Sequence, residues 1–320
     1  YMMSENLAKG ANNALSSAAR SYASRIDQFN RLNSKFLKTE AGLPAINAFI
    51  TRNAEPPFNR QALLEILRAL RSRQSDVITS YAILNTEGIN ILDTNVEDIG
   101  IDESRQRYFS TLANGGEMTS YRSPIIFDEQ GATIVFSSAI NDLSGKLIGV
   151  LRAKYDAEIL TTLFDRTKGM VGRGSFAILL DENSLRLVHG RRYDLKYTLA
   201  ENKSESTLQA LKAANRIPVA ATGKRAEDQS WMEKVHATNV RDPIIESQFY
   251  GLGTTMYSSA VVNLATAPWT IIVSLPESVF LEPVMKQTQN ALMLVGVIVF
   301  IVVLIVMAAT QLLLGPVKRL

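Results

Sequence analysis

The apolar positions near the start of the chain follow a helical period. Ile26, Phe29, Leu32 and Phe36 recur three or four residues apart, which places them along one side of a helix. We expect a single helix over residues 4–50, long enough to run along a two-domain body.

A second helix is predicted after a proline-containing break. The sequence Asn-Ala-Glu-Pro-Pro at residues 53–57 ends the first helical pattern, because proline lacks the amide donor that a helix interior needs. Leu63, Leu67 and Leu70 then recur at helical spacing, and this predicts a helix over residues 60–72.

From residue 77 the pattern changes to short, alternating apolar segments that are separated by turn residues. Such segments are typical of strands joined as antiparallel hairpins. A sheet built in this way after helices indicates an α+β fold rather than a doubly wound one. Strands are expected at residues 77–84, 89–93, 121–127, 133–140 and 147–155, with a short helix at 105–113.

A similar order then begins again, which suggests an internal duplication of structural pattern without matching residues. A linking helix is expected at residues 157–168. The second set comprises strands at 174–180, 185–189, 254–263 and 269–274, with a helix at 206–215.

Near its end the chain becomes almost purely apolar. Residues 291–310 carry no charged side chain, and a helix of that length spans the roughly 30 Å of a bilayer core. We therefore expect a transmembrane helix here, the alternative being a buried core helix. Lys318 and Arg319 favour a cytoplasmic C-terminus, although Lys286 opposes that orientation. Because the sequence starts within a helical pattern, we also expect an earlier anchor before it.

Composition excludes several classes of function. The net charge is +3 without a long basic run, so no nucleic-acid partner is expected. The absence of cysteine excludes a disulfide framework, a thiolate zinc site and a cysteine nucleophile. With two histidines and no recognisable catalytic arrangement, we expect neither an enzyme nor a bound metal or cofactor.

Several segments, taken in order, resemble the double Cache family of bacterial extracytoplasmic sensors. In that family a long N-terminal helix supports two tandem PAS-like modules with antiparallel sheets, between two transmembrane helices. The segments that carry the resemblance are SRQRYF at 104–109, IVFSSAI at 134–140, GKLIGVLR at 145–152, GSFAILLD at 174–181 and APWTIIV at 267–273.

The resemblance implies a receptor in the bacterial inner membrane, with its sensor region periplasmic or extracellular. The long helix offers a face for a homodimer, and residues 315–320 resemble the start of a HAMP linker to a chemotaxis, kinase or cyclase output. The implied parts are a signalling helix (1–55), a membrane-distal module (56–158), a membrane-proximal module (159–276), a juxtamembrane and transmembrane helix (277–314) and the linker (315–320).

The resemblance also places a small-molecule ligand in the distal module. The subgroup that binds amino acids has an Arg two positions before an aromatic pair and an Asp on the last strand. Here Gln106 precedes the pair Tyr108-Phe109, and Lys154 takes the strand position. A cation at that position disfavours an α-ammonium group, so an amino-acid ligand is not expected.

The residues themselves point to an organic anion such as a carboxylate. Arg152 and Lys154 project to one face of a strand, and arginine can hold a carboxylate by two parallel hydrogen bonds. Alternatively these two cations lie on an exposed face, or pair with Asp102, Glu103 or Asp156. A ligand-independent scaffold is the competing function. The remaining candidate ligand-binding residues are Arg105, Arg107, Tyr108, Tyr121, Ser123, Ser137 and Ser138.

Overall fold

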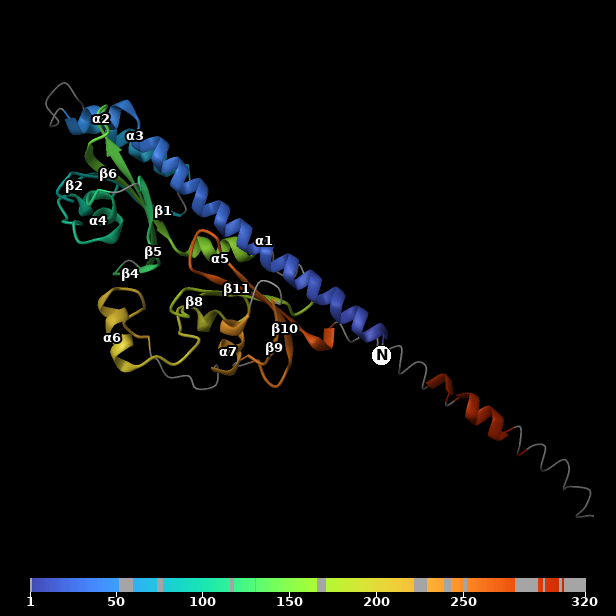
Figure 1. Ribbon diagram of the computed structural model, residues 1–320. Coiled ribbons are helices and arrows are strands. Elements are labelled where there is room, and N and C mark those ends of the chain that lie inside the picture. Colours follow the sequence, from blue (N-terminus) through green and yellow to red (C-terminus); the bar gives the residue numbers. More distant parts are fainter. Residues whose placement is uncertain are drawn as a thin grey trace, which may run out of the picture.

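Two antiparallel sheets lie one after the other along a single long helix in this computed structural model (Figure 1). The chain is α+β, as predicted. The structure describes residues 2–51, 60–73, 77–115, 118–129, 131–165, 171–221, 229–238, 243–249 and 252–279, together with 293–295, 297–304 and 307.

The long helix α1 (Met2–Ala41) buries one side along its length, including Leu15, Ile26 and Leu37. The expected continuous helix over residues 4–50 is wrong in one respect, because α1 stops at Ala41 and α2 (Pro44–Thr51) begins separately. Proline is excluded from a helix interior but suits a first helical position. The break predicted at 53–57 lies outside the described residues.

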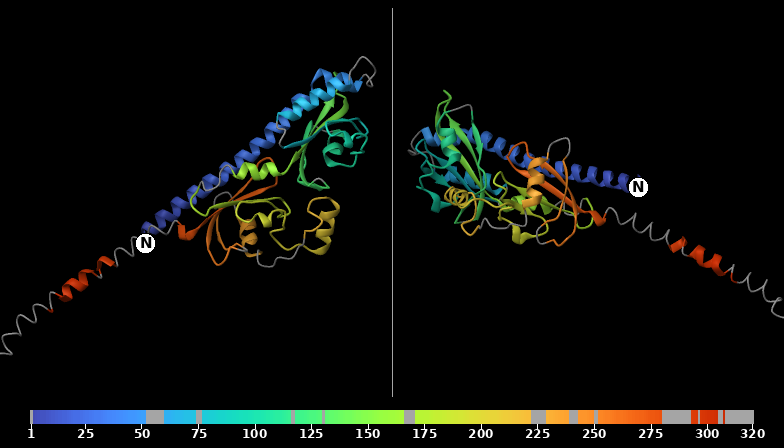
Figure 2. Two further views of the ribbon diagram at one scale, coloured as in Figure 1. Left: turned by 180° about the vertical axis from the view of Figure 1, so that it is seen from behind. Right: turned by 60° about the horizontal axis from the view of Figure 1, so that its bottom comes forward.

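The distal sheet has the strand order β2-β1-β6-β5-β3, and β4 also pairs with β5. Helices α1 and α3 pack on one of its faces and α4 on the other (Figures 1 and 2). Its elements are α3 (Arg60–Ser72), β1 (Ile78–Leu84), β2 (Asn90–Asp93), the 3-10 turn η1 (Val96–Asp98), α4 (Arg107–Ala113), β3 (Ser120–Arg122), β4 (Ile126–Asp128), β5 (Gly131–Asn141) and β6 (Leu147–Asp156).

The proximal sheet has the order β8-β7-β11-β10-β9. In both sheets the second strand is at one edge, followed by the first, the last, the last but one and the third, so the duplication is confirmed as topology. The elements are α5 (Glu158–Asp165), β7 (Phe176–Leu180), β8 (Arg186–His189), η2 (Tyr193–Leu195), α6 (Glu205–Ala213), α7 (Gln229–Ala237), β9 (Ile244–Ser247), β10 (Tyr257–Asn263) and β11 (Thr270–Pro276).

Three features were not anticipated. The single strand expected at 121–127 is two short strands, and Pro124 lies between them, where it has no amide to donate to a ladder. Helix α7 and strand β9 were also missed, since each is short and flanked by polar residues.

Polar side chains of α1 bind both sheets. The Asp27 carboxylate accepts hydrogen bonds from the backbone amides of the β10–β11 turn, at 3.0 Å from Ala265 and 2.8 Å from Thr266. Further along the helix, Asn33 accepts a bond of 3.0 Å from the Tyr155 hydroxyl on β6. The Tyr81 hydroxyl on β1 donates to Glu40. These bonds add specific positions to an otherwise apolar contact.

The two modules meet through cations and aromatic rings. The Arg122 guanidinium lies 4.7 Å from the ring centre of Trp269, and Phe127 packs edge-on against Tyr197 at 5.1 Å. Trp269 is buried at this junction. Arg216 donates to the Ile125 carbonyl oxygen at 3.2 Å, so the module boundary is a packed and hydrogen-bonded contact.

Eight of residues 291–310 and all of 315–320 lie outside the described residues. Within the part of the chain that the structure does describe, no helix combines the length and the apolar character needed to cross a membrane. The predicted membrane helix, HAMP-like linker and domain boundaries stay predictions.

Candidate ligand-binding site

One row of paired residues crosses the distal sheet on the face toward α4. The strand register aligns Asp93, Ala82, Arg152, Ser137 and Tyr121 from one strand to the next. Directly paired residues of antiparallel strands project to the same face. The fold therefore brings side chains that are far apart in the sequence into one line.

Arg152 is the centre of this row and has no exposed surface. Its Nε lies 3.1 Å from Glu103 Oε2 and its Nη2 lies 2.5 Å from Glu103 Oε1, a bidentate pairing. Nη2 is also 3.1 Å from Asp93 Oδ2, and Nη1 donates to the Ser80 hydroxyl. Of the pairings considered from the sequence, the one with Glu103 is observed.

The charges of this cluster alter neighbouring acidities. Burial raises the pKa of the Glu103 carboxyl, but the charge and hydrogen bonds of Arg152, together with the Tyr108 hydrogen bond and the Lys154 charge, hold that pKa below its ordinary value. The Tyr108 hydroxyl donates to Glu103 Oε2 at 2.7 Å. Burial and the Glu103 charge both raise the pKa of Tyr108. Glu103 is therefore charged and Tyr108 neutral at pH 7.

Lys154 and Asp98 form the part of the cluster nearest to solvent. Lys154 Nζ is 3.3 Å from Asp98 Oδ2, and their side chains are 17% and 10% exposed, against 0% for Arg152. Arg152 and Lys154 lie on one face, as expected, since Arg152 Nη2 is 4.0 Å from the same oxygen. Three carboxylates face two cations, which leaves one net negative charge.

Asn90 adds an unused acceptor to the cluster. Its Nδ2 donates to Asp93 Oδ2 at 2.8 Å and to Glu103 Oε1 at 3.3 Å. Its Oδ1 is buried without a hydrogen-bond partner among the described residues. A buried carbonyl oxygen in this position suits a donor group from a ligand or a water molecule.

The other predicted site residues divide between the cluster and elsewhere. Tyr121 is partly buried on the α4 face, and Ser137 donates to the Tyr108 carbonyl oxygen at 2.6 Å. Arg105 and Arg107 are exposed where α4 begins. Gln106 is the N-terminal cap position of that helix and is also exposed.

The other two predicted serines, like Ser137, form hydrogen bonds with backbone groups. Ser138 pairs with Leu151, so it projects to the face opposite Arg152, and it donates to the Thr119 carbonyl oxygen at 3.1 Å. Ser123 donates to the Pro124 carbonyl oxygen and accepts from the Val135 amide. Sequence reasoning missed Asp93 and Asp98, although Asp93 ends a predicted strand and alternation could have placed it on this face.

The sequence model of the Cache domain family, in its double Cache form, matches residues 2–284. The chain belongs to the double Cache family of extracytoplasmic sensor domains. Among curated protein sequences none matches significantly.

Solved sensor domains share the fold at low sequence identity. The sensor domain of the V. cholerae histidine kinase DctB aligns with a TM-score of 0.63 at 11% identity, covering 84% of this chain and 98% of that one. The ligand-binding domain of the Campylobacter jejuni chemoreceptor Tlp3 with L-valine aligns at 0.59 and 14%, covering 87% and 97%. That of the Pseudomonas fluorescens chemoreceptor CtaA with L-isoleucine aligns at 0.52 and 15%, covering 85% and 94%.

Proposed function

We propose that this chain is the ligand-sensing and signalling region of a bacterial transmembrane receptor and binds a small molecule on the α4 face of the distal sheet. The family supports a sensor, and the structural neighbours are sensor domains of histidine kinases and chemoreceptors. Attachment to the inner membrane by a C-terminal helix and homodimerisation are parts of the same proposal. No catalytic role is proposed for this region.

The observation that carries the ligand site is the partly exposed pair formed by Lys154 and Asp98. A bare anion that took Lys154 from Asp98 would leave a further unpaired carboxylate in a cluster that is already net negative. A ligand with both a carboxylate and an ammonium group avoids this. Its carboxylate would bind Lys154, its ammonium Asp98, and a donor would reach Asn90 Oδ1.

This changes the ligand expected from the sequence. The amino-acid class was disfavoured because Lys154 occupies the position of an acidic residue, but Asp98 on η1 brings a carboxylate to the same place. The neighbours crystallised with L-valine and L-isoleucine are consistent with a zwitterionic ligand. An organic anion without an ammonium group stays as one arm of the test.

Calorimetry with three matched panels tests the ligand class: dicarboxylates, amino acids and simple amines. We expect a binder among the amino acids, and either Lys154→Gln or Asp98→Asn should weaken it about tenfold or more. Ser138→Ala is the matched control, since Ser138 lies on the other face. Binding by dicarboxylates alone would overturn the zwitterion, and unchanged affinity in both variants would overturn the site. No response to any panel favours the ligand-independent scaffold.

Strands β6 and β1 each connect this site to α1, because adjacent residues of the same strand contact the cluster on one face and α1 on the other. Lys154 faces the cluster and its neighbour Tyr155 contacts α1, while Ser80 and Tyr81 have the same relation on β1. Alternation makes each strand a two-sided connection. Ligand binding should therefore change amide hydrogen exchange in α1 near Asn33, and an unchanged exchange pattern would argue against this route.

A further inference from the structure

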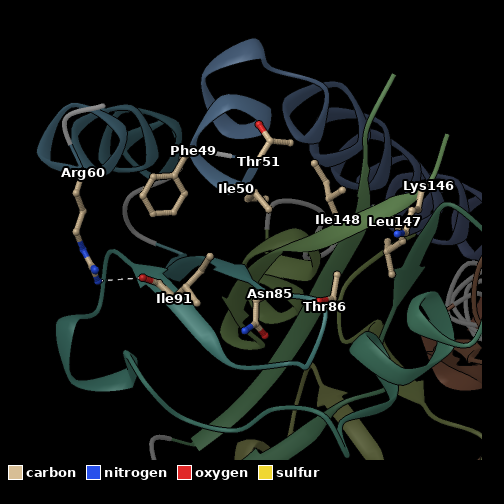
Figure 3. Close-up of a pocket in the computed structure, with 10 residues that line it drawn as sticks. All are labelled: Phe49, Ile50, Thr51, Arg60, Asn85, Thr86, Ile91, Lys146, Leu147 and Ile148. Atoms are coloured by element: carbon tan, nitrogen blue, oxygen red, sulfur yellow. Dashed lines mark hydrogen bonds between the residues drawn. The ribbon is translucent and has the colours of Figure 1, made fainter. Parts of the chain in front are cut away.

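A cavity, here called the tip pocket, lies at the end of the distal sheet that is away from Lys154. It has a volume of about 510 Å³, within the range of small-molecule sites. Strand β6 runs from this end past Ile148 to Lys154, and the six residues from Ile148 to Lys154 span about 20 Å. The lining residues come from α2, the start of α3, the β1–β2 hairpin and the start of β6 (Figure 3): Phe49, Ile50, Thr51, Arg60, Asn85, Thr86, Ile91, Lys146, Leu147 and Ile148.

The shape of this tip pocket depends on a glycine. A side chain on Gly149 would come within 2.6 Å of the Leu84 carbonyl oxygen and 3.1 Å of Ile50 Cδ1. Without one, α2 can sit directly on the end of the sheet beside the cavity. The apolar part of the lining comes from Phe49 and Ile148 together with Ile50, Ile91 and Leu147.

The polar part of the lining has one sign of charge. Arg60 and Lys146 are both exposed and lie on different sides of the cavity in Figure 3. Among the described lining residues there is no carboxylate. Arg60 Nη2 donates to the Ile91 carbonyl oxygen at 2.9 Å, which anchors the guanidinium at the rim. This bond uses one of five guanidinium N–H donors.

We propose that the tip pocket binds a small organic anion with an apolar body, such as a medium-chain or aromatic carboxylate. The apolar body packs against Phe49 and Ile148, and the carboxylate accepts hydrogen bonds from Arg60 or Lys146. Hydroxyl groups of Thr51 and Thr86 complete the rim. The site is independent of the zwitterion site in both position and charge.

Attraction by exposed cations weakens with salt, since the Debye length falls from about 10 Å at 0.1 M to about 3 Å at 1 M. Binding at the tip pocket should therefore weaken as salt rises. The apolar contribution should persist under the same conditions.

Hexanoate, hexylammonium and hexanol share one apolar body and differ in charge, and they serve as probes by NMR titration of the whole chain. We expect hexanoate to bind most tightly, with shifts at residues 49–51, 85–86 and 146–148. Combining Arg60→Gln with Lys146→Gln should weaken hexanoate about tenfold and leave hexanol unchanged. Lys38→Gln, which removes an exposed cation on α1, is the matched control.

A variant with a large side chain at the cavity provides the second readout. Thr86 is exposed on the hairpin, so Thr86→Trp fills the cavity without touching the core. This variant should abolish binding of both hexanoate and hexanol. Equal binding of hexanoate and hexylammonium, or full hexanoate affinity in the plugged protein, would overturn the proposal. Neither result bears on the site at Lys154 and Asp98, which is tested by its own variants.

Discussion

Replacing Arg152 by Met should destabilise the distal module severely. The substitution keeps an unbranched side chain but leaves the Asp93 and Glu103 carboxylates, with side chains 0% and 6% exposed, without their cation. Breaking a buried ion pair by removing one partner costs about 3–5 kcal/mol. That is a large part of the roughly 5–15 kcal/mol that stabilises a typical domain.

Lys154→Met is the matched control. Lys154 is partly exposed, and its partner Asp98 keeps a second cation because Arg152 Nη2 lies 4.0 Å from the same carboxylate oxygen, so removing Lys154 should cost less than removing Arg152. Urea denaturation measures both variants. Trp231 lies within the proximal module, whereas Trp269 lies at the junction against Arg122, so fluorescence is read in the Trp269→Phe background while circular dichroism reports both modules. A transition that moves more by circular dichroism than by tryptophan fluorescence locates the loss in the distal module.

The pH dependence gives a separate test of the reasoning. In the native protein the pKa of Glu103 lies below its ordinary value, so its stabilising contribution is present at neutral pH and is lost as pH falls through that folded pKa. Without Arg152, which is the main influence that lowers the pKa of Glu103, burial dominates and raises that pKa, so acidification favours the folded variant. The difference in unfolding free energy between the wild type and Arg152→Met should therefore shrink as the pH falls toward and through the ordinary glutamate pKa of about 4.3. If the unfolding free energies of the wild type and Arg152→Met differ by less than about 1 kcal/mol at pH 7, or by an amount that does not depend on pH, then Arg152 does not form the buried ion pairs described here.

Three further predictions concern other parts of the fold. Gly149→Ala should destabilise the distal module by about 1–3 kcal/mol in urea denaturation, because the added carbon would meet the Leu84 carbonyl oxygen at 2.6 Å. Asp27→Ala should cost about 2 kcal/mol or more through the loss of three hydrogen bonds to the β10–β11 turn, and should speed amide exchange there; unchanged exchange would contradict the contact. Burial raises the pKa of Asp181 to about 6, so this group favours the folded state below pH 4 and the effect is lost as the pH rises through 6. Burial lowers the pKa of His189 to about 4, so this group favours the folded state above pH 6.5 and the effect is lost as the pH falls through 4. In Asp181→Asn only the His189 effect remains, so stability should fall as the pH is lowered from 6.5 to 4. In His189→Gln only the Asp181 effect remains, so stability should fall as the pH is raised from 4 to 6. Identical pH profiles of the two variants in thermal denaturation would show that neither group acts in this way.

The periodicity of apolar residues predicted those helices and strands whose formation depends on residues close together in the sequence. Helix α3 occupies the range expected from its leucine spacing, because its apolar side alone determines how it packs. The end of α1 was missed because apolar spacing continues across Gly42 and Pro44, whereas the backbone cannot continue there. Pattern and backbone chemistry disagree at this point, and the backbone decides.

The candidate site was less accessible to sequence reasoning because its contacts are not local. Arg152 and Lys154 were correctly placed on one face by alternation. Their partners depend on strand register, since Asp93 is 59 residues from Arg152 and Asp98 is 56 residues from Lys154. Ser137 and Ser138 were both named as candidate hydroxyl donors, but adjacent residues of a strand project to opposite faces, and Ser138 lies on the face away from Arg152.

The hydrogen bonds along α1 determine which motions this helix can transmit. Apolar contacts tolerate small slips, but bonds from Asp27 to the proximal sheet and from Asn33 and Glu40 to the distal sheet have fixed partners. A slip of one residue, about 1.5 Å along the axis, would break bonds on both sheets at once. Sliding α1 along its axis therefore requires both modules to release their hydrogen bonds to the helix together.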